Sequence, residues 1–168
     1  RPVWLDLKKS IAQTWPESSR ENDLDPKYRT LSPSDFGFHN ALKDGEEITF
    51  IDFEYFGWDD PVKLTADFLW HPAMELHPNL TAKWKNSMLD IFASEPYFKE
   101  RLNAAMPLYG LRWAMIVLNE FLPGFAGRRK NAGGTDSYNL EQTRKVQLKK
   151  AKHYCEKVKA MISQGTDA

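Results

Sequence analysis

The sequence predicts one mainly α-helical domain over residues 1–168, with one small β-hairpin. Three observations favour this fold class. Apolar residues recur at helical spacing through most of the chain, and a glycine-containing turn near residue 45 separates two short segments with strand character. The length of 168 residues, of which 42% are hydrophobic, suits one packed core and is short for two ordinary domains.

We expect the following elements in chain order: a helix at 3–15, a loop at 16–34, a hairpin at 39–53, and helices at 61–70, 80–94, 96–105, 107–122 and 139–164. Asp44-Gly45 supplies the positive φ angles that a tight hairpin turn needs. Asp60-Pro61 provides an N-cap and a first helical residue, and Pro107 separates two helices because proline interrupts helical hydrogen bonding. The helix at 107–122 is apolar around most of its circumference, so we expect it at the centre of the core. The Gly- and Arg-rich segment 124–138 is expected to be a mobile loop.

The composition excludes several classes of protein. The 23 Lys and Arg residues balance the 23 Asp and Glu residues, so we expect neither nucleic acid nor membrane as a partner. Cys155 is the single cysteine, which excludes an intrachain disulfide, and we find no signal peptide or long apolar run. These features favour a cytoplasmic location. Because the chain begins with Arg1 rather than Met, we expect it to be a piece of a longer polypeptide.

Two motifs contain the candidate chemistry, SPSDFGFHN at 32–40 and ITFIDFEYFGWDDP at 48–61. Asp35 precedes Asn40 by five positions, which is the spacing of the base and the magnesium-binding Asn in kinase catalytic loops. Asp52 is expected in an apolar strand, where an unpaired carboxylate would be costly and a divalent cation would relieve that cost. One Asp and one Asn oxygen suit Mg²⁺, which keeps several of its waters.

The register of the predicted hairpin determines whether Asn40 and Asp52 lie opposite each other. Counting from an Asp44-Gly45 turn sets Asn40 opposite Thr49 rather than Asp52. A shared ion therefore requires that the strands bend or that the register differs from this count.

The motifs S-D-F-G-F-H-N and I-D-F-E-Y-F-G-W-D-D-P resemble the aminoglycoside phosphotransferase and choline kinase-like family, which has the protein-kinase-like (α+β) fold. The later segment LRWAMIVLNEFLP is similar to the C-terminal lobe of such enzymes, so the resemblance extends over most of the chain. It implies that Asp35 is the catalytic base, that Asn40 and Asp52 bind Mg²⁺, and that Asp60 is a structural acid. The implied activity is transfer of the ATP γ-phosphate to a hydroxyl group of a small molecule.

The chain also departs from the family pattern. Pro33 and Gly37 stand where many members have His, and Leu64 stands where many have Asp. No G-x-G-x-x-G loop and no V-A-I-K-like lysine precede Asp35, so the nucleotide-binding N-terminal lobe is absent from these residues. We therefore expect the isolated lobe to be inactive, its partner to be an N-terminal lobe of the same protein, and its exposed docking face to favour a homodimer. The alternative is a non-catalytic, kinase-like binding or scaffold domain.

Three further residues have two possible roles each. His39 could contact phosphate or metal, but a histidine that holds the loop by hydrogen bonding is favoured. Glu54 lies two residues after Asp52, on the same face of the expected strand, and could support the metal or pair with a base. Arg112 could line an acceptor pocket or form an internal salt bridge to a loop acid.

Overall fold

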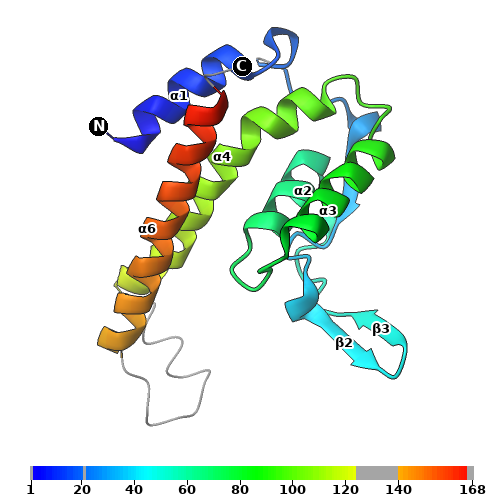
Figure 1. The fold of residues 1–168 in the computed structure, drawn as a ribbon. Coiled ribbons are helices and arrows are strands. Elements are labelled where there is room, and N and C mark those ends of the chain that lie inside the picture. The colour runs from blue at the N-terminus through cyan, green and yellow to red at the C-terminus, as the bar shows by residue number, and fades with distance from the viewer. Residues whose placement is uncertain (1, 21, 124–139, 166–168) are drawn as a thin grey trace.

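The computed structural model describes residues 2–20, 22–123 and 140–165, and it is mainly helical (Figure 1). Its α-helices are α1 (Val3–Thr14), α2 (Pro61–Trp70), α3 (Pro78–Ile91), α4 (Phe98–Val117) and α6 (Leu140–Gly165). Its strands are β1 (Thr30–Ser32), β2 (Ala41–Asp44), β3 (Glu47–Phe50) and β4 (Gly57–Asp59). Short 3₁₀ turns occupy Glu17–Ser19, Pro26–Tyr28, Phe38–Asn40 and Leu118–Phe121. The predicted loop at 124–138 lies outside the described residues.

The core forms around α4. This helix lies alongside α6, and α1 packs against both of them, while α2 contacts α4 and α3 contacts α2 (Figure 1). The buried cluster joins Val62 and Trp70 of α2 to Leu102 and Ala114 of α4 and to Val158 of α6. The central position predicted for the apolar helix is therefore confirmed.

Helix α4 corrects the prediction of two helices at 96–105 and 107–122. One continuous helix runs from Phe98 to Val117 with Pro107 inside it, and Pro107 is buried. Proline removes one helical hydrogen bond and disturbs the preceding turn, at a cost of about 3 kcal/mol. Packing against α1, α2 and α6 along the length of α4 outweighs that local cost, which no pattern in the helix itself reveals.

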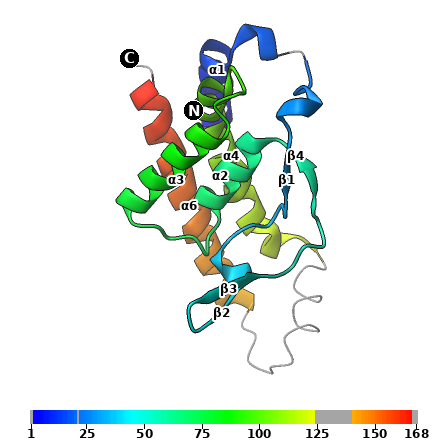
Figure 2. The same cartoon turned by 90° about the vertical axis from the view of Figure 1, so that its right-hand side faces the viewer.

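The strands form two separate antiparallel pairs (Figure 2). In the first pair Thr30 is opposite Asp59 and Ser32 is opposite Gly57. The loop predicted at 16–34 therefore contains β1. A three-residue strand has little signal of its own, and its partner β4 follows the hairpin, so only the fold brings the two strands together.

The second pair, β2 with β3, is the predicted hairpin in a different register. Asp44 is opposite Glu47, so the two turn residues are Gly45 and Glu46, and Gly45 adopts the positive φ of 58° that the turn requires. Because the turn lies one residue later than predicted, the register shifts by two. Asn40 consequently lies beside Ile51, whose backbone N–H donates to the Asn40 carbonyl at 2.9 Å, and not opposite Thr49.

Among the described helices we find none that combines the length and the apolar character needed to cross a membrane.

Candidate functional site

The loop that precedes Asp35 is fixed by three polar contacts. The Ser32 hydroxyl accepts from the backbone N–H of Ser34 at 3.0 Å, and Ser34 adopts a left-handed φ of 67°. Lys63 of α2 donates to the Ser34 hydroxyl at 2.9 Å and pairs with the Asp59 carboxylate at 2.7 Å. Helix α2 and strand β4 thus hold the backbone immediately before Asp35.

Hydrogen bonds connect Asn40 to Asp35 and to the residue before Asp52. The Asn40 side-chain amide donates to the backbone carbonyl of Asp35 at 2.9 Å, which closes the loop between them. The Asn40 carbonyl accepts from Ile51, the residue directly before Asp52. Since the amide nitrogen of Asn40 is the donor to Asp35, its side-chain oxygen is left available as a ligand atom.

Asp52 does not occupy an apolar strand as predicted. Strand β3 ends at Phe50, and Asp52 is exposed, with a left-handed φ of 63°. The Asp52 carboxylate is solvated, so it carries no burial cost for a cation to relieve. The strand position predicted for Glu54 is also wrong, since this residue lies in the turn after the hairpin, where its carboxylate hydrogen-bonds to the Tyr55 hydroxyl and raises the Tyr55 pKa.

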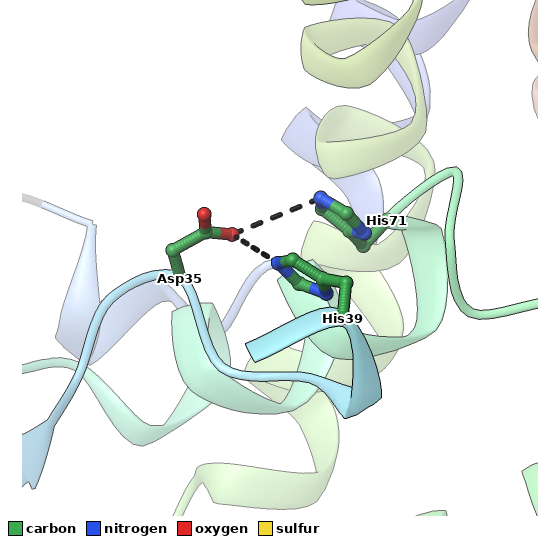
Figure 3. Close-up of side chains that lie close together, drawn as sticks. All are labelled: Asp35, His39 and His71. Carbon is green, nitrogen blue, oxygen red and sulfur yellow. Dashed lines mark hydrogen bonds and ion pairs between the residues drawn. The ribbon is translucent and has the colours of Figure 1, made fainter. Parts of the chain in front are cut away.

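Two histidines converge on the Asp35 carboxylate (Figure 3). His39 Nε2 lies 3.2 Å from Asp35 Oδ1, and His71 Nε2 lies 3.7 Å from the same oxygen. The two imidazole rings stack with centroids 4.0 Å apart and an interplanar angle of 7°. Both contacts involve Oδ1, and Oδ2 points away from the two rings (Figure 3). The favoured role of His39, holding the loop by hydrogen bonding, agrees with this geometry.

The protonation of His71 follows from its other ring nitrogen. The backbone N–H of Ala73 donates to His71 Nδ1 at 3.2 Å, so Nδ1 accepts and the proton of the neutral ring is on Nε2, facing Asp35. Burial, together with the neighbouring His39, lowers the pKa of His71 below its ordinary value of 6.5, against the opposing effect of Asp35. His71 is therefore neutral at neutral pH, and its Nε2–H faces Asp35 Oδ1 at 3.7 Å, beyond direct hydrogen-bond distance.

The donor atoms of Asp35, His39 and His71 lie within 4.8 Å of one another, a spacing that a transition metal could bridge. Metal binding through His71 Nε2 would need the proton on Nδ1, where the Ala73 N–H already points. The Nε2 lone pairs of the two histidines also lie in nearly parallel ring planes, with the ring centroids 4.0 Å apart, so they do not meet at one point. The cluster is thus better suited to orienting the Asp35 carboxylate than to binding a metal ion.

His71 was not among the site residues predicted from the motifs. It follows the last residue of α2, where Trp113 of α4 packs its ring against the imidazole edge-on, with centroids 4.8 Å apart. The only local signal is that Pro72 ends the helix just after it. The distance between His71 and Asp35 depends on how the end of α2 packs against the loop that contains Asp35.

Arg112 forms an internal salt bridge, one of its two predicted roles. Its guanidinium lies 2.5 Å from Asp67, whose carboxylate also accepts from Trp113 Nε1 at 2.9 Å and lies 3.6 Å from the Lys63 ammonium. The acid belongs to α2 rather than to a loop, and the Arg112 side chain is 43% exposed rather than buried. These contacts fix α2 to α4 next to the Asp35 loop.

Asp60 has the structural role that was predicted. Its carboxylate accepts from the Val62 N–H at 2.8 Å and thereby caps α2, with Pro61 as the first helical residue. Arg101 of α4 pairs with Asp60 and, at 3.0 Å, with the buried Glu95. The cap thus connects the start of α2 to the first turn of α4.

A comparison of the chain with models of known protein families, with curated proteins and with solved structures finds no match in any of the three.

Proposed function

We propose that this chain is the C-terminal, kinase-like lobe of an ATP-dependent phosphotransferase that modifies a hydroxyl group of a small molecule. In this proposal Asp35 is the catalytic base, Asn40 and Asp52 bind Mg²⁺, and ATP is held against them by an N-terminal lobe of the same protein. The motif resemblance suggests the reaction class, and the geometry around Asp35 supports the assignment of roles.

The observation that carries the proposal is the backbone conformation of two residues. Within the described part of the chain, the non-glycine residues with positive φ are Ser34, directly before the proposed base, and Asp52, a proposed metal ligand. Such conformations are unfavourable by roughly 1–2 kcal/mol each for an ordinary residue, and backbone strain of this kind is concentrated at functional sites. Asp52 is itself a proposed ligand and Ser34 is adjacent to the proposed base, which favours a functional reason for their conformation.

Asp35 is suited to activating a hydroxyl group. His39 and His71 approach one carboxylate oxygen and limit its rotation, and the other oxygen is free to accept a proton from the substrate. Phosphoryl transfer requires mainly positioning and charge stabilisation from the protein. A carboxylate held in one orientation supplies the positioning of the attacking oxygen.

Asn40 and Asp52 fit the requirements of Mg²⁺. They offer one amide oxygen and one solvated carboxylate, which are hard ligands of the type that Mg²⁺ prefers. The hydrogen bond from the Ile51 N–H to the Asn40 carbonyl holds the backbone at Asn40 beside the backbone that leads into Asp52. Bound Mg²⁺ would neutralise phosphate charge, while the residues of this chain hold the acceptor hydroxyl at Asp35.

The test uses the full native polypeptide that contains these residues. Purified protein is incubated with γ-labelled ATP, Mg²⁺ and a panel of hydroxyl-bearing metabolites, and transfer of the label is measured. Asp35→Asn and Asp52→Asn should each lower turnover by at least about a hundredfold, as expected for a general base and for a metal ligand. The matched control is Asp90→Asn, the same change at an exposed position of α3, which should leave turnover unchanged.

Unchanged turnover in Asp35→Asn or Asp52→Asn would refute the roles assigned to them. If the full polypeptide neither binds ATP with Mg²⁺ nor transfers phosphate, the alternative of a non-catalytic binding or scaffold domain is favoured instead.

A further inference from the structure

A cavity is lined by the segment 71–77, which connects α2 to α3, and by residues of α3 and α6. Its volume is about 640 Å³. Pockets that enclose small organic molecules typically measure roughly 300–1,000 Å³. His71 contributes to its wall, and the same imidazole contacts Asp35. The cavity is therefore a neighbour of the proposed catalytic loop without including it.

The floor of the cavity is apolar and fixed. Trp70, Met106 and Tyr154 line it and are buried. The Trp70 indole donates to the Met106 carbonyl at 2.9 Å, and its ring meets Tyr154 edge-on with centroids 5.7 Å apart. Because each ring is held by a partner, the floor is already formed and can accept an apolar body without reorganisation.

The charged groups of the cavity favour an anion. Lys85 of α3 and Lys157 of α6 line it from opposite helices, and Glu75 is the one acid in the lining. With histidine counted as neutral, two lysines and one glutamate leave a net charge of 2 − 1 = +1. Lys157 also lies over the Trp70 ring, with its ammonium 4.9 Å from the centroid. That ring face is already occupied by a cation, so a ligand ammonium would meet like charge there.

We propose that this cavity binds an amphipathic organic anion, with its apolar body against the Tyr154 side of the floor and its carboxylate, sulfonate or phosphate group between Lys85 and Lys157. Binding needs no nucleotide and no phosphate transfer. The further step, that this anion is the acceptor whose hydroxyl reaches Asp35 past His71, rests on the proposed function.

The experiment compares two probes with the same apolar body and opposite charge, naphthalene-1-sulfonate and naphthalene-1-methylammonium. Each is titrated into the purified chain without ATP, and binding is followed by calorimetry and by chemical-shift changes of the tryptophan indole N–H groups. The sulfonate should saturate with a Kd below about 1 mM and shift the Trp70 signal, and the ammonium should bind at least about tenfold more weakly. Because no nucleotide is present, a negative result leaves the phosphotransferase proposal to its own assay.

Lysine variants test the charge assignment. Lys157→Met and Lys85→Met should each weaken sulfonate binding roughly three- to tenfold, since each removes one charged partner of the anion. Lys152→Met is the matched control, because Lys152 is an exposed lysine of α6 outside the cavity lining, and it should bind as the unchanged protein does. Circular dichroism and urea unfolding confirm that each variant is folded.

Equal or tighter binding of the ammonium probe would overturn the proposal. So would unchanged sulfonate affinity in both Lys157→Met and Lys85→Met, or absence of saturation by the sulfonate up to about 10 mM.

Discussion

Arg101 is the residue whose loss should most damage the support of the candidate site. It lies in α4 and is buried, and its guanidinium pairs with Glu95 at 3.0 Å and with Asp60, the cap of α2. The same group lies over the Trp15 ring at 5.9 Å, next to α1. Arg101→Met keeps most of the apolar stem and removes the charge, so it isolates the ionic part of these contacts.

The expected magnitude follows from what remains after the change. The Glu95 side chain is only 4% exposed and would keep one donor, the Tyr97 N–H at 3.0 Å. Loss of one partner from a buried ion pair costs about 3–5 kcal/mol, because the other charge stays buried. The Asp60 carboxylate is 32% exposed and retains its bond from Val62, so water compensates for most of its loss. We therefore expect the free energy of unfolding to fall by about 3–5 kcal/mol.

Urea unfolding followed by tryptophan fluorescence measures this change. Lys99→Met is the matched control, since Lys99 is exposed on the same helix, and it should change stability by less than about 0.5 kcal/mol. The double variant Glu95→Gln with Arg101→Met should recover much of the loss because no unpaired charge is left in the core. A loss below about 1 kcal/mol for Arg101→Met, or no recovery in the double variant, would refute the reasoning.

Three further predictions concern the candidate site. A Cβ at Gly37 would lie 2.7 Å from His39 Nδ1, so Gly37→Ala should displace the His39 ring from Asp35. We expect phosphate transfer to fall about tenfold or more and the free energy of unfolding to change by less than about 2 kcal/mol. Folding lowers the His71 pKa, so below pH 6.5 the unfolded chain binds more protons than the folded chain. His71 should therefore destabilise the fold as the pH falls, with a slope of at most about 1.4 kcal/mol per pH unit. His71→Gln should remove that part of the slope when the free energy of unfolding is measured by urea titration at several pH values. Asp52→Gly should abolish transfer and change the unfolding free energy by no more than about 1 kcal/mol, because glycine accepts the left-handed φ of 63°.

Each of these has a result that contradicts it. Full activity in Gly37→Ala would show that the His39 ring does not orient Asp35. A pH slope equal in His71→Gln and the unchanged protein would assign the acid sensitivity to other groups. Strong destabilisation by Asp52→Gly would mean that the Asp52 carboxylate supports the fold and has been misassigned as a ligand.

Local patterns were enough to predict α2, its Asp60 cap and the first helix, because capping, proline position and helical periodicity act within a few residues. The same holds for the existence of the hairpin, since Gly45 marks its turn. The spacing of Asp35 and Asn40 in the sequence also indicated a local loop, which the hydrogen bond between these two residues closes.

Only the tertiary structure decided the remaining features. Strand β1 exists because β4 is brought beside it, and α4 continues through Pro107 because three helices pack against it. The hairpin register, and with it the exposure and left-handed backbone of Asp52, depends on a one-residue shift of the turn that the sequence leaves open. His71 reaches Asp35 because the end of α2 lies beside the Asp35 loop, and the lining of the cavity with Lys85 and Lys157 comes from α2, α3, α4 and α6, which are distant in the chain. Such contacts depend on the balance of packing over the whole core, so motif spacing identifies individual side chains, and the fold determines which of them meet.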